Sequence, residues 1–165
     1  MTTADLEATF LIVGGGIAGV SCAELLHQES THLDAHDLEA VSIVLVTASP
    51  LIKAVTNIDH LTRHLASFDV SEEAAGDFQR RHDNVTVIED TVAEVDVEAK
   101  VAVTAGGRMI AYGKLCLCHG ARPKVAFAGN PYVVGIRDTQ SVRDFQERLK
   151  QARRVVILGN GGIGE

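Results

Sequence analysis

The chain has 165 residues, of which 46% are apolar and 22% are charged. This composition is typical of a folded globular protein with one real core and argues against a disordered chain. The net charge of −7 gives no support for a surface that binds nucleic acid or anionic lipid. Three cysteines are too few for a disulfide framework. The first residues are acidic, unlike those of a signal or transit peptide, and no early apolar run is long enough to cross a bilayer. These features and the low cysteine content favour the cytoplasm or nucleus.

The first predicted element is a buried parallel strand over Thr9–Val13, an apolar run with β-branched members. A glycine loop follows directly, with the sequence Gly14-Gly15-Gly16-Ile17-Ala18-Gly19, and then a helical pattern over residues 17–28. In a dinucleotide-binding loop the first glycine permits the tight turn, the third lets the backbone approach the pyrophosphate, and the last lets helix and strand pack closely. The strand and helix on either side favour this reading over a glycine-rich turn without a ligand.

A second buried strand is predicted over Val41–Val46, after a polar segment that reads as a surface loop. A carboxylate at the end of this strand normally binds the adenosine ribose in dinucleotide-binding domains. Here Thr47-Ala48-Ser49 takes that place. The Thr47 hydroxyl can form one hydrogen bond to the ribose, weaker than that of a charged acceptor, or it is only the polar end of the strand.

The next segment has apolar residues at helical spacing, namely Ile58, Leu61, Leu65 and Phe68. This spacing predicts a helix, and Ser71-Glu72-Glu73 predicts the start of another, with acids in its first turn. His60 and His64 would then be four apart on a helix, which is also a metal-ligand spacing. No third ligand is evident, so a solvated helix face is the better interpretation and no metal site is predicted.

A third strand is predicted over Val85–Ile88, after which the apolar period changes to two. Three segments with that period predict a small antiparallel meander, over residues 91–96, 101–104 and 109–112. Leu115–Cys118 reads as a further strand. The sequence therefore predicts an α/β fold, a Rossmann-like parallel sheet with a small antiparallel β-meander.

The last part of the chain predicts a helix that starts near Asp138-Thr139 and a buried strand over Arg154–Leu158. That strand leads into a second glycine loop with Gly159, Gly161 and Gly164, and two such loops indicate two dinucleotides. No helix follows the second loop, so we expect a C-terminally truncated chain. Residues 1–150 would be the N-terminal portion of an FAD-binding domain, and residues 151–165 the first strand and glycine loop of an NAD(P)H-binding domain.

Three parts of the sequence together resemble the FAD/NAD(P)-binding flavoprotein reductases with two dinucleotide domains, the pyridine nucleotide-disulfide oxidoreductases. They are the first glycine loop, the run Leu115-Cys116-Leu117-Cys118-His119-Gly120-Ala121-Arg122-Pro123, and the second glycine loop. Further strings that match members of this family are Val46–Asn57, Gly129–Thr139 and Gly159–Ile163. They are spread over nearly the whole chain.

The resemblance implies FAD on the first domain and NAD(P)H on a second one. It implies that Cys118, His119 and Gly120 pass close to the flavin cofactor, that Lys53 lies near the flavin ring, and that the backbone at Val92 reads the adenine edge. The wider family has a small residue and a threonine before this glycine, so side-chain contacts at residues 118 and 119 stay open. No catalytic residue is assigned.

The family name suggests a redox-active disulfide, which the cysteine spacing does not support. Cys116 and Cys118 are two apart on a predicted strand and would face the same side, a poor geometry for a local disulfide. Cys22 lies on the helix after the glycine loop without a nearby cysteine in sequence. All three are interpreted as small apolar packing residues.

Three functions are consistent with these patterns. The first is an FAD-dependent oxidoreductase that takes hydride from NAD(P)H and reduces an unidentified acceptor, with this chain inactive alone. The second is a redox-dependent binding protein with little turnover, for which the resemblance implies protection of a tRNA ligase complex. The third is a plain NAD-binding domain without flavin. No direct contact with nucleic acid or membrane is expected.

Overall fold

The computed structural model describes residues 4–32, 41–60, 66–121, 124–125, 127, 129–136 and 139–158. The chain forms two compact units, residues 1–120 and residues 121–165. The first unit contains the sheet and the glycine loop. The second contains helix α4 (Thr139–Gln151), which confirms the helix predicted to start near residue 139. The assignment of residues 1–150 and 151–165 to two nucleotide-binding domains stays a prediction.

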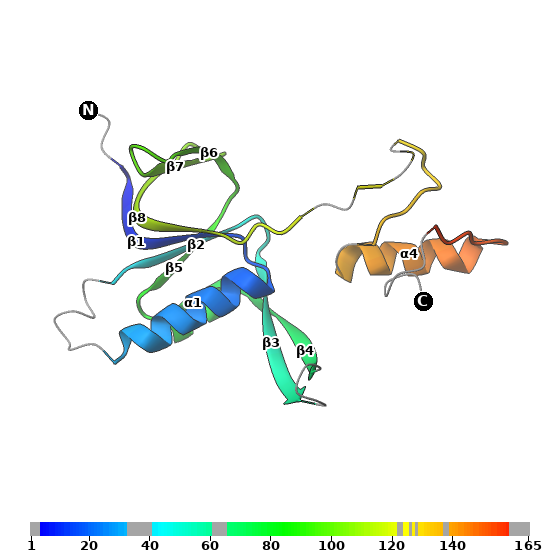
Figure 1. The fold of residues 1–165 in the computed structure, drawn as a ribbon, viewed down its shortest axis with the longest axis horizontal. Helices are drawn as coiled ribbons and strands as arrows, with labels where there is room; N and C mark the ends of the chain where they lie inside the picture. The colour runs from blue at the N-terminus through cyan, green and yellow to red at the C-terminus, as the bar shows by residue number, and fades with distance from the viewer. Residues whose placement is uncertain are drawn as a thin grey trace. The chain divides into compact units, whose positions relative to one another are not determined.

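A six-stranded sheet forms the body of the first unit (Figure 1). Its members in chain order are β1 (Leu6–Val13), β2 (Ile43–Thr47), β5 (Val85–Glu89), β6 (Val92–Asp96), β7 (Val101–Thr104) and β8 (Met109–Leu117). In space they follow the order β5-β2-β1-β8-β7-β6. The first four of these are parallel neighbours, and β7 and β6 continue the sheet antiparallel. The predicted α/β class, a parallel sheet with an antiparallel meander, is confirmed.

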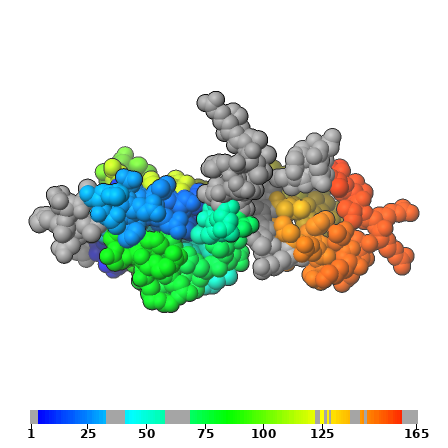
Figure 2. All heavy atoms as spheres, turned by 90° about the horizontal axis from the view of Figure 1, so that it is seen from below, coloured from blue at the N-terminus to red at the C-terminus, as the bar shows by residue number. Residues whose placement is uncertain are grey.

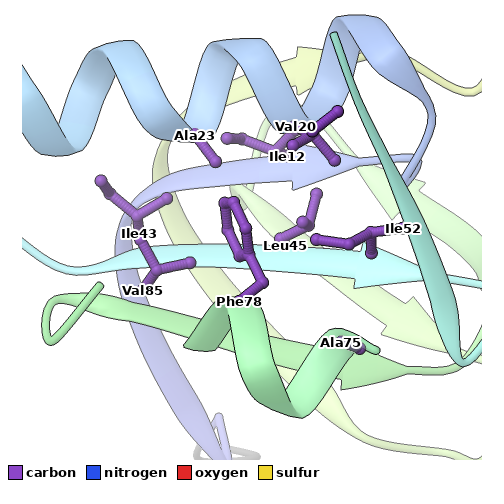
Figure 3. Packing of buried hydrophobic residues seen from close by; sticks show 10 residues of the cluster. Ile12, Val20, Ala23, Ile43, Leu45, Ile52, Ala75, Phe78 and Val85 are labelled. Atoms are coloured by element: carbon purple, nitrogen blue, oxygen red, sulfur yellow. The ribbon is translucent and has the colours of Figure 1, made fainter. Parts of the chain in front are cut away.

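Helices α1 (Ile17–Ser30) and α3 (Ala75–Arg81) cover one face of the parallel strands and lie side by side on the surface in Figure 2. Alternate strand residues point to this face, because successive side chains of a strand point to opposite sides. Phe78 of α3 is fully buried among them (Figure 3). The core on this face, called the α1-side core below, comprises Ile12, Val20, Ala23, Ile43, Leu45, Ile52, Ala54, Ala75, Phe78 and Val85.

A second core lies on the opposite face, where the intervening strand residues such as Leu11 and Val44 meet Ala102 of the meander. The structure corrects the prediction of separate strands over residues 109–112 and 115–118, because β8 is one continuous strand. The polar Gly113-Lys114 step interrupts the apolar pattern and suggested a break. β8 pairs with β1 on both sides of Gly113, so the strand continues past this residue. The two strands lie close together there, because a Cβ at Gly113 would be 2.9 Å from the Thr9 carbonyl oxygen.

The helix predicted from the spacing of Ile58 to Phe68 is wrong, because the described residues there belong to the antiparallel strands β3 (Leu51–His60) and β4 (Ala66–Ala74). The helix predicted to start at Ser71 is α3, which begins only at Ala75. The β-branched residues of β3 favour a strand, and cross-strand pairs such as Lys53 opposite Glu72 support it, which outweighs the helical spacing. His60 is a strand residue, and His64 lies outside the described residues.

The buried strand predicted over Arg154–Leu158 is also wrong. These residues form no strand, and Val156 and Leu158 are 81% and 73% exposed. An apolar run becomes a buried strand only beside partner strands, and the described part of the second unit contains no strand. The second glycine loop, Gly159, Gly161 and Gly164, lies outside the described residues. Within the described ranges, no helix has the length and apolar character needed to cross a membrane.

Candidate dinucleotide-binding site

The first glycine loop connects β1 to α1 at the carboxyl ends of the parallel strands. Gly14 has a φ of 117°, in the region that favours glycine, and its N–H donates to the Val46 carbonyl at 2.8 Å. The Lys53 N–H donates to the Gly15 carbonyl at 3.1 Å. Strands β2 and β3 therefore hold the loop through backbone hydrogen bonds.

Two glycines of the loop are required because backbone atoms of the protein approach them closely. A Cβ at Gly19 would lie 1.8 Å from the Gly14 carbonyl oxygen, and a Cβ at Gly14 would lie 2.3 Å from the Cys118 carbonyl oxygen. Both distances are shorter than any atomic contact allows. The first turn of α1, the loop and the end of β8 thus approach at backbone distance.

Gly16 differs from these two glycines because the protein leaves space beside it. Its backbone is extended, with φ −80° and ψ −179°, and a Cβ there would meet no described atom within 4 Å. Neither the fold nor the backbone angle therefore requires glycine at residue 16. The open space lies at the start of α1, where an approaching phosphate needs it.

The start of α1 favours an anion. Gly16 is the N-cap, no side chain caps the helix, and no acidic residue lies in its first turn. The first N–H groups of a helix have no partner within it, and the helix dipole adds partial positive charge there. Ala18 is exposed and Ile17 half-buried. This end of α1 can bind a phosphate through its backbone, with no basic side chain.

Thr47 lies beneath the loop at the end of β2. It is only 2% exposed, and a Cβ at Gly15 would lie 2.4 Å from its Oγ1 atom. The Thr47 hydroxyl donates to the Ser49 carbonyl at 3.1 Å and accepts from the Ser49 N–H at 3.3 Å. The hydroxyl therefore stabilises the turn after β2, and its only proton is used within the protein.

The remaining predicted residues lie at the same edge of the sheet. The Lys53 Nζ atom is 3.5 Å from the Glu72 carboxylate, and both side chains are half-buried. The Cys118 N–H donates to the Val13 carbonyl at 2.8 Å, which places the half-buried Cys118 and the exposed His119 and Gly120 beside the loop.

Val92 begins β6, just beyond the carboxyl end of β5. The structure thus brings the glycine loop, Thr47, Lys53 and residues 118–120 together at this edge. Val92 lies two residues after Asp90, whose N–H donates to the Thr47 carbonyl at 2.9 Å. The predicted NAD(P)H residues are outside the described part.

The three cysteines are half-buried, free, and packed against the α1-side core. Burial raises the pKa of the Cys22 thiol to about 11, and a hydrogen bond with the Cys116 side chain adds to the rise. Burial also raises the pKa of Cys118. A thiol held protonated is a poor nucleophile and a poor metal ligand. Among the described residues, no group of three or more His, Cys, Asp or Glu side chains is arranged to hold a metal ion.

Asp90 is a residue at this edge that the sequence analysis missed. Its carboxylate accepts the Thr91 N–H at 2.7 Å and the Gly106 N–H at 3.0 Å. A hydrogen bond from the Thr104 side chain, followed by these backbone bonds, lowers the pKa of Asp90. The carboxylate therefore joins the β5–β6 turn to the turn before β8. An aspartate just after a predicted strand is a signal for such a turn.

The fold and the loop define an α/β protein of the FAD/NAD(P)-type oxidoreductase fold. A family model described as pyridine nucleotide-disulphide oxidoreductase matches residues 8–165. The chain belongs to this family, which confirms the resemblance inferred from the glycine loops and the residues around Cys118.

Curated relatives named pyridine nucleotide-disulfide oxidoreductase domain-containing protein 1 are similar to nearly the whole chain. The protein of Pongo abelii is 49% identical over 154 residues, and that of Rattus norvegicus is 48% identical over 163 residues. These matches cover 93% and 99% of this chain, but only 29% and 31% of the relatives. The chain thus spans less than a third of their length.

Solved structures share the fold at low sequence identity. A ferredoxin reductase of Rhodopseudomonas palustris is 22% identical with a TM-score of 0.66, and the match covers 94% of this chain and 37% of that one. A sulfide:quinone oxidoreductase of Aquifex aeolicus is 18% identical with a TM-score of 0.61, covering 88% and 32%. These likenesses support the fold assignment.

Proposed function

We propose that this chain supplies the FAD-binding loop of an oxidoreductase that takes hydride from NAD(P)H. The observation that carries the proposal is the contrast within the loop. Gly14 and Gly19 are required by packing, whereas Gly16 faces open space at an uncapped helix start. A glycine without an internal reason, at the position where a pyrophosphate approaches, is explained by a ligand.

The residues present fit a dinucleotide. The first N–H groups of α1 would hold the pyrophosphate, and the Cys118-His119-Gly120 turn would border the cofactor. Lys53 would place a positive charge near the ring, because its N–H is bonded to Gly15 and its strand is therefore anchored to the loop. Bound flavin would supply the two-electron chemistry. In the complete protein, the reduction potential of bound flavin in a Lys53→Met variant tests this role.

Titration of FAD, followed by flavin fluorescence, tests the proposal on the chain itself. A Gly16→Ala variant should weaken FAD binding by about tenfold or more, which corresponds to about 1.4 kcal/mol, because its methyl group occupies the phosphate approach. Its thermal unfolding midpoint should change only slightly, since the protein leaves that space open and only the preference of the N-cap for glycine over alanine is lost. Equal FAD affinity in the variant and the wild type would contradict the proposal.

We also propose that the 165 residues alone bind FAD weakly and show no NAD(P)H oxidase activity. Two facts support this: the chain spans about 30% of its curated relatives, and residues 154–158 form no strand. Retention of one FAD per chain through gel filtration would refute it. Steady-state turnover of NAD(P)H by the complete protein separates an oxidoreductase from a redox-dependent binding protein. Association with a tRNA ligase complex and a cytoplasmic or nuclear location stay predictions.

A further inference from the structure

Glu89 is the last residue of β5 and lies at the same edge of the sheet as the glycine loop. It is the register partner of Thr47 across the parallel pair of β2 and β5. Register partners in parallel strands point to the same face and lie about 4.8 Å apart. Val85 and Val87, which alternate with Glu89 along β5, pack in or against the α1-side core. The Glu89 side chain therefore leaves the sheet on the same side as Thr47 and α1.

The Glu89 carboxylate is available to a ligand. The residue is exposed, and no described residue forms a hydrogen bond or an ion pair with its side chain. Its neighbours at this edge are occupied. The Asp90 carboxylate binds two backbone N–H groups and Thr104, the Glu72 carboxylate lies 3.5 Å from Lys53, and the Thr47 hydroxyl bonds Ser49.

We propose that Glu89 binds the ribose hydroxyls of the adenosine half of the dinucleotide, the role usually filled by an acid at the end of the second strand. With the pyrophosphate at the start of α1, the adenosine extends along this edge over the end of β2. A glutamate on the neighbouring strand is long enough to reach across one strand spacing. Its two oxygens accept both ribose hydroxyls as charge-assisted hydrogen bonds, which a single hydroxyl cannot do. This inference rests on the proposed nucleotide function.

Binding of ADP and 2′-deoxy-ADP, measured by chemical-shift titration of the 165-residue chain, tests the inference. The wild type should bind ADP about tenfold more tightly than 2′-deoxy-ADP, in line with one charged hydrogen bond. In Glu89→Gln the affinity for ADP should fall by about tenfold or more. The affinity for 2′-deoxy-ADP, which keeps only the 3′-hydroxyl, should fall by less, so the preference for ADP should narrow. Glu98→Gln, which removes an exposed acid from the turn between β6 and β7, is the matched control and should retain the wild-type ratio.

The outcomes separate this inference from the proposed function. If Glu89→Gln binds ADP and distinguishes the two nucleotides as the wild type does, Glu89 is not the ribose ligand, and the nucleotide site stands. If Glu98→Gln weakens the ribose preference equally, the effect is one of net charge and the inference is overturned. If the folded wild type binds neither nucleotide, the proposed function fails and this inference fails with it.

Discussion

The two ends of helix α1 are built in different ways. At its start, the loop approaches β8 and the chain after β2 through backbone groups, and no side chain caps the helix. At its end, side chains make the connections. The His27 Nδ1 donates to the Asn84 Oδ1 at 2.7 Å, and the Asn84 Nδ2 donates to the Ser30 hydroxyl at 2.8 Å.

The end of α1 is thus satisfied within the protein. The Ser30 hydroxyl donates to the His27 carbonyl, and the rings of His27 and His82 meet edge to face at 4.8 Å. His82 in turn donates from Nδ1 to the Phe78 carbonyl at 2.9 Å, which ties α3 into the same network. A helix end whose polar groups are paired internally has no need of a ligand, whereas the uncapped start keeps donors available for one. The end of α1 therefore has a structural role, and its start is the end that can bind a ligand.

The largest expected effect is a loss of stability when a side chain is added at the start of α1, where the helix and the loop lie closest. Gly19→Ala places a methyl group where the Gly14 carbonyl oxygen lies, so the helix must move away from the loop. We expect a loss of about 3 kcal/mol in the free energy of unfolding, measured by urea denaturation. Gly16→Ala is the matched control, with a much smaller expected loss because it meets no neighbouring atom. Equal stability of Gly19→Ala and the wild type would mean that the loop is not closely packed.

A smaller effect is expected at the other end of α1. Asn84→Ala removes the partners of His27 and Ser30 together and should lower the free energy of unfolding by about 1–3 kcal/mol. FAD or ADP affinity should not change, because the network is remote from the glycine loop. Asn84→Asp keeps the acceptor for His27 and should recover part of the loss. If Asn84→Ala weakens nucleotide binding while the protein stays folded, the division between the two ends is wrong.

The sequence predicted the parts of this fold that depend on local pattern. The strand, glycine loop and helix around Gly14 follow from an apolar run, a glycine spacing and a helical period, all local signals. The β3–β4 hairpin does not follow from the sequence pattern, because its stability comes from pairing between segments such as those of Val55 and Val70. The helical spacing relates only residues that are close in sequence. Pairing between distant segments overrides local periodicity.

In the candidate site, too, some residues follow from local sequence patterns and others only from the pairing of distant strands. The resemblance and the spacing identified the loop, Lys53 and the turn at Cys118, but the roles of Thr47 and Glu89 depend on strand register. Only the pairing of β2 with β5 shows that Glu89 lies beside Thr47, 42 residues away in sequence. The spacing could not show that the Thr47 hydroxyl is used by Ser49, since that depends on the turn after the strand.

A third prediction concerns Asp90, whose carboxylate joins two turns at the same edge of the sheet as the glycine loop. Its pKa is lowered in the folded protein, so its ionised form stabilises the fold above the unfolded pKa of about 3.9. That stabilisation is lost as the pH falls through the lower folded pKa. Asp90→Asn should lower the thermal midpoint at pH 7, and the difference from the wild type should narrow at pH 3. A difference independent of pH would show that the charge has no part in joining the two turns.

The last prediction concerns the reactivity of the Cys22 thiol, in the middle of α1. It involves no change in stability at neutral pH. Because its pKa rises from 9.0 to about 11, the thiolate fraction at pH 7.5 is about 100-fold lower than in an unfolded chain. Alkylation of Cys22 by iodoacetamide, followed by mass spectrometry, should be slower by about that factor in the folded protein and should accelerate up to pH 11. Above pH 9 the unfolded chain loses this proton while the folded protein keeps it, so stability should fall as the pH rises toward 11.

Cys116→Ala is the matched variant for Cys22, because it removes the hydrogen bond between the two thiols and leaves most of the burial. Burial is the larger cause of the raised pKa, so Cys22 in this variant should still react more slowly than in the unfolded chain, though faster than in the wild type. Rapid labelling of folded wild-type Cys22 at pH 7.5 would show a reactive thiol beside the glycine loop. The cysteines could then no longer be treated as packing residues, and a thiol step would have to be considered for this edge of the sheet.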